Sequence, residues 1–426
     1  MANDIAGSPI TRLPWAGKQV RVEEVETTLS ALWKMSADNM RIGANLHVRT
    51  SVLNLLICTP DTQSALYASK LLRDLSSTHI ARATLVILDQ RTSTPAASAS
   101  PDTAGVSGAL NASDTLESWV TLRCFSMISD MMRHCFEQTT LLASGQATKT
   151  LVSTLSGVLK AHLPVYLWWI GDTRSSDDTI FRDMARLSER VIVDSATFFQ
   201  PEQDIHTLAG YCKAAPQTAL SDLNWGRLTH WRQLLAQFFD VPEYLPYLKG
   251  IERIEIEHVV APLAEMERSE SGEVSLNPTA ALLLAGWLKT SLNLSMVEQS
   301  SQNQRDTASG TYQWELKQSG NGRQTLLQIQ PRVQAGVHPG SLYLVRLTCK
   351  SGNQRTVFTI KREADSNHVQ TSVESAERTR PVRTVNLPDK QNASELLHNE
   401  LEITVHDQLF EQALQELELL LGGETK

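Results

Sequence analysis

The sequence lacks a long apolar run and an excess of basic charge, and both absences limit what the protein can do. No run approaches the roughly 20 apolar residues of a transmembrane helix, and the opening residues, MANDIAGSPITRLPWAGK, lack the apolar core of a signal peptide. The formal net charge is −8 with a pI near 5.8, whereas general nucleic-acid binding needs a basic face. We therefore expect a cytoplasmic protein with no membrane association and no nucleic-acid partner.

Cysteine is scarce as well, and its distribution excludes the usual cysteine-based sites. The five cysteines are odd in number, scattered, and show no C-x-x-C spacing. Such a set is neither a disulfide framework nor a zinc site. We expect each to be a reduced thiol, mostly buried as a small apolar side chain. The residues concerned are Cys58, Cys124, Cys135, Cys212 and Cys349.

The common catalytic and cofactor-binding motifs are absent. The sequence contains no G-x-G-x-x-G, Walker loop, H-E-x-x-H or G-x-S-x-G, so the sites that these motifs build are not indicated. The eleven histidines are dispersed, and no two stand four residues apart, as two metal ligands on one helix face would. We predict no catalytic residue, no metal site and no cofactor, which lowers the expectation of an enzyme.

The chain is organised around the run LPVYLWWIGD at Leu163–Asp172. Its aromatic and β-branched residues after a proline predict a strand. Side chains alternate along a strand, so Trp168 and Trp169 should lie on opposite faces, and a strand that is apolar on both faces belongs inside an α/β sheet. Two interpretations stay open: the tryptophans are core residues, or one lies near the strand end, where such sheets bind their partners.

A length of 426 residues exceeds one ordinary core, so two domains are expected. Residues 1–245 alternate strands and helices, as a layered α/β domain with a largely buried mixed sheet does. A proline-containing linker is expected at Val241–Gly250. Residues 246–426 contain strand-like runs separated by glycine-rich turns, which predict an antiparallel sheet domain with helices on one face. A Ser-, Thr-, Gly- and Pro-rich mobile loop is expected at Thr92–Ser113.

Helices are expected where apolar residues recur at helical spacing. They are Arg21–Met35, a helix capped by Asp61 that ends near Leu75, Lys149–His162, Thr179–Leu187, Thr279–Leu292, and one long or two shorter helices within Ala393–Leu421. The strand at Arg190–Asp194 ends in Asp-Ser, which is either a site at a sheet edge or an ordinary helix cap.

The segment DLNWGRLTHWRQLLAQFFD at Asp222–Asp240 is unusually rich in tryptophan and arginine. On a helix, Trp231 shares the apolar face and should be core. Trp225, Arg227 and Arg232 lie off that face and belong to residue types that are enriched at binding hot spots. We name Trp168, Trp169 and these three as candidate partner-binding residues. The alternative is a core helix whose arginines pair with acids.

Several blocks of the sequence, in the same order, resemble the OpcA family, the glucose-6-phosphate dehydrogenase assembly proteins. They are RTSVLNLL at Arg49–Leu56, Glu137 after Cys135-Phe136, LPVYLWWIGD at Leu163–Asp172, RVIVDS at Arg190–Ser195, DLNWGRLTHWRQLLAQFFD at Asp222–Asp240 and LLLAGWLKTSLNL at Leu282–Leu294. The resemblance implies a non-catalytic allosteric activator that binds the dehydrogenase, promotes its active oligomer and raises its activity in the oxidative pentose phosphate pathway.

Members of this family in photosynthetic bacteria are associated with thiol control, so the resemblance also implies thioredoxin as a further partner. No cysteine follows Cys349, so the redox candidates are Cys124 and Cys135, which could flank a turn between neighbouring strands. With no C-terminal pair, we expect reductant to change activation little. A second class of function stays open, an enzyme or metabolite sensor that holds a sugar phosphate at a helix N-terminus.

Overall fold

The computed structural model divides the chain into two compact units. The first comprises residues 1–171 and 175–192, and the second comprises residues 172–174 and 193–426. The structure describes residues 13–38, 46–47, 51–76, 81–89, 115–126, 132–173, 179–262, 277–297, 300–301, 303–307, 309–363, 367–375, 382–387 and 393–422. The loop expected at Thr92–Ser113 lies outside these residues.

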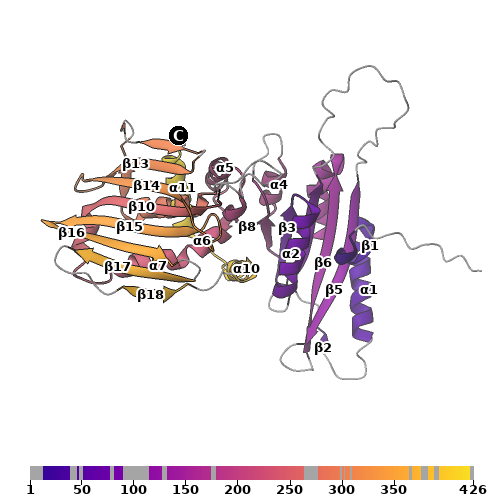
Figure 1. The fold of residues 1–426 in the computed structure, drawn as a ribbon. Coiled ribbons are helices and arrows are strands. Elements are labelled where there is room, and N and C mark those ends of the chain that lie inside the picture. Colours follow the sequence, from indigo (N-terminus) through magenta and orange to yellow (C-terminus); the bar gives the residue numbers. More distant parts are fainter. Residues whose placement is uncertain are drawn as a thin grey trace, which may run out of the picture. The chain divides into compact units, whose positions relative to one another are not determined.

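The first unit is a mixed sheet with helices on its faces (Figure 1). Its strands are β1 (Lys18–Val20), β2 (Leu46–His47), β3 (Leu53–Thr59), β4 (Ala81–Asp89), β5 (Leu116–Ser126), β6 (Met132–Ser144), β7 (Val165–Trp169) and β8 (Arg190–Val193). The order within the unit is β1-β5-β6-β4-β3-β7-β8, with β2 beside β6. β1, β5 and β6 pair antiparallel, whereas the strands from β6 to β8 pair parallel.

Helices cover this sheet with their apolar stripes, which lie where the sequence pattern predicts them. They are α1 (Val25–Asp38), α2 (Thr62–Leu75), α3 (Leu151–Val158) and α4 (Ile180–Arg186), with 3-10 turns η1 (Pro14–Ala16), η2 (Val22–Glu24) and η4 (Gly145–Thr150). Asp61 caps α2, since its Oδ1 accepts the Ser64 amide at 2.8 Å. On the α1 side, the Trp33 indole donates to Glu137 at 2.5 Å, and Arg82 lies 3.7 Å from the same carboxylate.

The second unit is built on a second sheet. Its strands are β10 (Ile251–Val260), β11 (Leu294–Met296), β12 (Gln304–Asp306), β13 (Thr311–Gln318), β14 (Gln324–Val333), β15 (Leu342–Ser351), β16 (Gln354–Arg362), β17 (His368–Ser375) and β18 (Arg383–Asn386). The order is β11-β13-β14-β10-β15-β16-β17-β18. The predicted antiparallel sheet is confirmed except at one pair, because β10 lies parallel to β14 and separates the two hairpin pairs.

Helices and one short strand complete the second unit. They are η5 (Ser195–Thr197), α5 (Pro201–Ala214), β9 (Ala219–Asp222), α6 (Leu223–Arg227), α7 (Thr229–Phe238), η6 (Leu245–Gly250), α9 (Thr279–Ser291), α10 (Ala393–Glu402) and α11 (Gln408–Leu420). α9 is buried along its length, as predicted. It approaches α11 so closely at Gly286 that a Cβ there would lie 2.3 Å from the Ala413 carbonyl oxygen, so only glycine fits.

The expected linker is instead part of the second unit. The position proposed as the boundary, residue 245, begins η6, and Tyr247 within it is buried. The Tyr247 hydroxyl donates to Gln354 of β16 at 3.2 Å, and its ring lies 6.1 Å from that of Phe358. The segment expected to be a linker is therefore a 3-10 turn that packs against β16.

Candidate functional site

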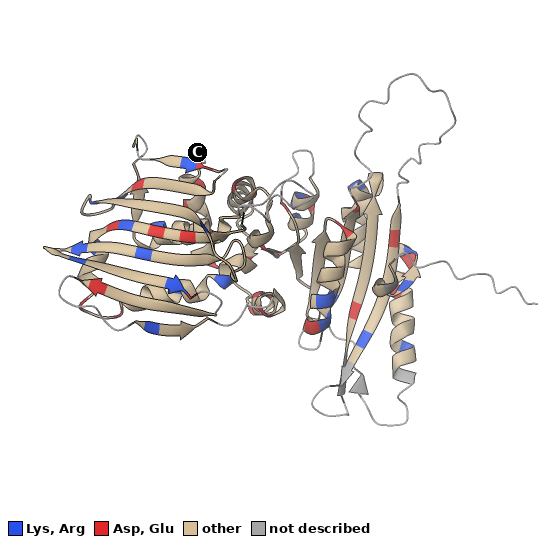
Figure 2. Ribbon diagram, viewed as in Figure 1, with Lys and Arg blue, Asp and Glu red and all other residues tan. Residues whose placement is uncertain are grey.

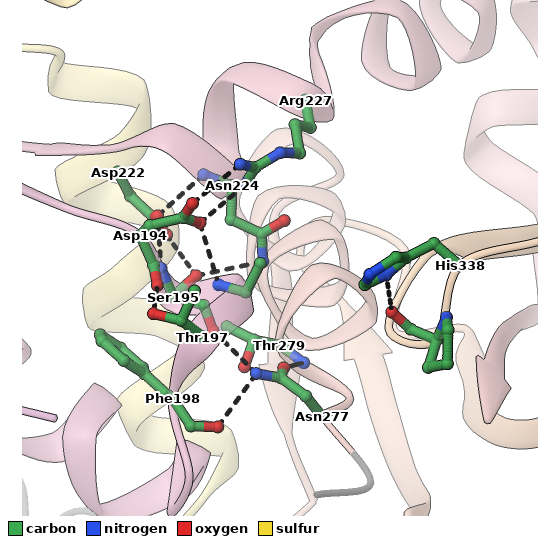
Figure 3. A network of polar contacts seen from close by, with 12 residues as sticks. Asp194, Ser195, Thr197, Phe198, Asp222, Asn224, Arg227, Asn277, Thr279 and His338 are labelled. Carbon is green, nitrogen blue, oxygen red and sulfur yellow. Dashed lines mark hydrogen bonds and ion pairs between the residues drawn. The ribbon is translucent and has the colours of Figure 1, made fainter. Parts of the chain in front are cut away.

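A buried polar cluster forms where β8 and β9 end, and it contains the Asp-Ser pair singled out in the sequence (Figure 3). Asp194 follows β8 and caps η5, accepting the Ala196 amide at 3.2 Å. Asp222 ends β9 and caps α6, accepting the Asn224 amide at 2.9 Å. Both strand-to-helix turns are thus set locally by an aspartate N-cap.

Ser195 joins the two turns. Its amide donates to Asp222 Oδ1 at 2.9 Å and its hydroxyl lies 2.6 Å from Oδ2. Asn224 Nδ2 donates to the same hydroxyl oxygen at 3.1 Å. Ser195 and Asp222 are each only 1% exposed and Asn224 is 4% exposed. The interpretation of Asp194-Ser195 as a helix cap is therefore confirmed, and the cap is also part of a longer-range network.

Asn277 extends this network to the start of α9. Its Nδ2 donates to the Ser195 carbonyl at 2.9 Å and to the Phe198 carbonyl at 3.1 Å. Its Oδ1 accepts the Thr279 amide at 2.9 Å. This bond caps α9, because Pro278 at the N-cap position makes no side-chain hydrogen bond. One side chain thus satisfies backbone groups of two separate turns.

The two aspartates of the cluster, Asp194 and Asp222, lie in different electrostatic environments. Arg227 makes a bidentate pair with Asp194, with N–O distances of 2.6 and 2.8 Å. Burial, followed by the nearby negative charge of Asp194, raises the pKa of Asp222 from 3.8 to about 7. The three hydrogen bonds that Asp222 accepts oppose this shift. Near neutral pH, Asp222 is therefore close to the midpoint of its titration.

This geometry is that of a closed structural junction. The Ser195 hydroxyl is hydrogen-bonded to a carboxyl group and an amide, and among the described residues no histidine contacts it, so it has no general base of the usual kind. Both partners of the hydroxyl, Asp222 and Asn224, are buried. Among the described residues, no group of three or more His, Cys, Asp or Glu is placed to hold a metal ion.

The tryptophan- and arginine-rich segment is not one helix but two, α6 and α7, divided at Leu228. Trp231 is 3% exposed, which confirms its predicted core position. Trp225, expected to lie off the apolar face that carries Trp231, is 2% exposed and therefore also buried. It is covered because its Nε1 donates to Asp407 at 2.8 Å and its ring lies 5.6 Å from Phe410, both from the C-terminal segment.

The two arginines of this segment contact groups within the unit. The Arg232 guanidinium lies 3.5 Å from the centroid of the Trp225 ring and donates to Thr229 Oγ1 at 3.1 Å. Burial lowers the pKa of Arg232 from 12.5 to about 10. Arg227 is engaged with Asp194. The alternative of arginines paired with acids therefore describes Arg227, whereas Arg232 contacts a ring and a hydroxyl group. Dehydrogenase binding by either arginine stays a prediction.

The adjacent tryptophans of β7 lie in the first unit. Trp168 is 2% exposed and Trp169 is 7% exposed, and the Trp169 ring makes an edge contact with Phe181 of α4 at 5.2 Å. Their positions agree with the core interpretation. Partner binding by either would need this packing to open.

Cys124 and Cys135 form a disulfide across the antiparallel pair β5–β6. The expectation that every cysteine is reduced is therefore wrong for these two. They stand 11 residues apart in the sequence and are directly opposite each other in the antiparallel register. The other three cysteines are free and buried, as expected, and burial raises the pKa of Cys58, Cys212 and Cys349.

The roles of Asp222 and Asn277 could not be read from the sequence. Each precedes a helix, so an N-cap could have been proposed for both. Their partners stand 27 and 82 residues away, however, and no local pattern indicates such contacts.

Two family models match this chain and together cover most of it. The glucose-6-phosphate dehydrogenase subunit N-terminal domain matches residues 72–210, and the C-terminal domain of the same subunit matches residues 218–414. The chain therefore belongs to the OpcA family. The N-terminal model ends at residue 210, within α5, and the C-terminal model begins at residue 218, just before β9.

Curated relatives carry the same family name. The OxPP cycle protein OpcA of Nostoc punctiforme is 33% identical over 158 residues, which are 37% of this chain and 30% of that protein. The OxPP cycle protein OpcA of Synechocystis is 25% identical over 284 residues, 66% of this chain and 54% of that protein. The chain thus spans about a third to about half of the length of these relatives.

Solved structures of other families are only distantly similar. The super-repressor mutant of Gal80p from Saccharomyces cerevisiae has a TM-score of 0.40 at 9% identity and covers 88% of this chain and 95% of its own. The WlbA dehydrogenase of Bordetella pertussis has a TM-score of 0.36 at 10% identity, over 87% of this chain and 92% of its own.

Among the described residues, no helix is long and apolar enough to span a membrane.

Proposed function

We propose that this chain is a non-catalytic, cytoplasmic partner of glucose-6-phosphate dehydrogenase, which binds the enzyme, promotes its active oligomer and raises its activity. The observation that carries the proposal is the match to both subunit domains, over residues 72–210 and 218–414. The curated relatives are named OxPP cycle protein OpcA, which supports a role in the oxidative pentose phosphate cycle.

The candidate site supports a binding role rather than catalysis. The polar residues that converge at Ser195 and Asp222 are buried and hydrogen-bonded to one another. A catalytic serine would need a base and access for a substrate. The protein therefore acts through its surface, by binding the active state of the dehydrogenase more tightly than the inactive state.

The test is a titration of the purified chain into the dehydrogenase while NADPH formation is followed. The chain should lower the apparent KM or raise kcat of the dehydrogenase, and sedimentation should show a larger enzyme assembly. If the chain lowers KM by tightening substrate binding, glucose-6-phosphate must tighten the complex by the same factor, because coupling between two ligands is reciprocal. Heat-denatured chain serves as the control.

Two results would contradict the proposal. One is an unchanged dehydrogenase at saturating chain. The other is turnover of glucose-6-phosphate or its lactone by the chain alone that survives repurification, which would favour the sugar-phosphate enzyme.

We further propose thioredoxin as a partner that reduces the one disulfide among the described residues, with little change in activation of the dehydrogenase. Disulfides in cytosolic proteins are chiefly catalytic or redox-sensing, so the Cys124–Cys135 bond is a candidate substrate for thioredoxin. Cys135 is only 3% exposed, whereas Cys124 is partly exposed and is the sulfur that a reductant would reach. Incubation with thioredoxin followed by thiol counting tests this step.

A further inference from the structure

The second sheet carries a shallow concavity on the face opposite its buried side chains. Its volume is about 720 Å³, and it lies over β10, β15, β16 and β17. Alternate residues of these strands point into the core or into the concavity, as the burial pattern of β16 shows. An antiparallel sheet often leaves one face to solvent, so the side chains on this face decide whether it has a further role.

These side chains are predominantly cationic. Arg253, Arg346, Arg355 and Lys361 line the concavity together with Glu255 and Glu374, so four cations face two carboxylates and leave an excess of two positive charges. The whole chain has a formal net charge of −8. We call these six side chains and Lys350 the cationic face. Figure 2 shows basic positions on β15 and β16.

The strand register places like charges side by side on the cationic face. Lys350 of β15 is directly opposite Arg355 of β16, and directly opposed like charges destabilise a sheet. Arg355 is relieved in part by Glu252, at 3.2 Å, and Arg346 by Glu255, at 3.6 Å. The Arg355 side chain is nevertheless 66% exposed, where such a pair contributes little. A fold that keeps an unfavourable local arrangement commonly does so at a binding surface.

The extent of the cationic face determines what could bind it. It runs from the pair Leu344–Lys361 to the pair Lys350–Arg355, six residues along the strand, or about 20 Å at roughly 3.4 Å per residue. The cations at the two ends of the face cannot converge on one phosphate group, whereas carboxylates spread over a protein surface can pair with cations along its whole length. We infer that the cationic face docks an acidic surface of glucose-6-phosphate dehydrogenase. The inference rests on the proposed function.

The test reverses two charges and measures affinity for the dehydrogenase at several salt concentrations. Arg355→Glu combined with Lys361→Glu should weaken the complex about tenfold or more at low salt and flatten its salt dependence. The matched control is Lys70→Glu combined with Lys149→Glu, which changes the charge equally at exposed positions of the first unit. The control pair should bind within about twofold of wild type.

Melting curves establish that each variant is folded, and Arg355→Gln with Lys361→Gln replaces the reversal pair if that pair does not fold. Normal melting with wild-type affinity for the dehydrogenase would overturn the inference and leave the proposed function standing. A wild type that does not bind the dehydrogenase would overturn both. A thermal shift of the wild type by glucose-6-phosphate that the variant lacks would assign the face to a small anion. Dimerisation lost in the variant would assign it to a second copy.

Discussion

The buried carboxyl group of Asp222 should make the stability of the second unit depend on pH. Its pKa is about 7 in the folded chain against an ordinary value of 3.8, so the folded state binds the proton more tightly than the unfolded state does. The stabilisation is fully present below pH 3.8 and is lost as the pH rises through about 7. A difference of roughly three pKa units, at 1.36 kcal/mol each, is about 4 kcal/mol of unfolding free energy.

Asp222→Asn isolates this contribution, because the amide has the shape of the protonated acid and cannot ionise. Its Oδ1 can still accept the amides of Ser195 and Asn224, and its Nδ2 can donate to the Ser195 hydroxyl that Oδ2 contacts in the wild type. The unfolding free energy of the variant relative to wild type should therefore rise by about 4 kcal/mol between pH 4 and pH 8. Dehydrogenase binding at pH 6 should be unchanged.

Urea denaturation across this pH range, followed by tryptophan fluorescence, measures the difference. Asp240→Asn is the control, because Asp240 is exposed at the end of the same segment and should leave the pH dependence as it is in wild type. Parallel stability curves for wild type and Asp222→Asn would refute the reasoning. They would mean that the hydrogen bonds to the carboxylate outweigh its burial and that Asp222 is ionised throughout.

Three further predictions concern the other candidate residues. Trp231→Ala should lower the unfolding free energy by about 3–5 kcal/mol, since a fully buried indole leaves a cavity; a melting curve checks it, and a loss under about 1 kcal/mol would contradict the burial. Reduction of the Cys124–Cys135 bond, whose cysteines are 11 residues apart, should destabilise the first unit by roughly 3 kcal/mol and change activation of the dehydrogenase little. The Cys124→Ser variant should show no loss of stability on reduction. Equal melting of the wild type with and without reductant would argue against the bond. Arg227→Ala should cost about 1–3 kcal/mol of unfolding free energy through its bidentate pair, and Arg232→Ala should also melt early because it uncovers a buried ring. Variants that melt normally and bind the dehydrogenase weakly would instead support both arginines as interface residues.

Local patterns in the sequence were sufficient for most elements. The strand that contains Trp168 and Trp169, the Asp61 cap of α2, the apolar helix α9 and the core position of Trp231 all follow from periodicity and capping. These features depend on residues within a few positions of one another, so the chain determines them before any long-range contact forms.

The contacts that shape the candidate site were decided by the tertiary structure. Trp225 is buried because Asp407, 182 residues later, accepts its indole proton. Ser195 is joined to Asp222 across 27 residues and to Asn277 across 82 residues. β10 lies between β14 and β15 although both follow it in the chain.

Sequence spacing carries no information about which distant elements meet, because that choice is made by the burial of whole apolar faces against one another. Once the faces pack, the polar groups caught between them must find partners, since an unpaired buried group costs about 1–3 kcal/mol. The pKa of Asp222 and the closure of its cluster are products of that packing and not of the aspartate's own sequence context.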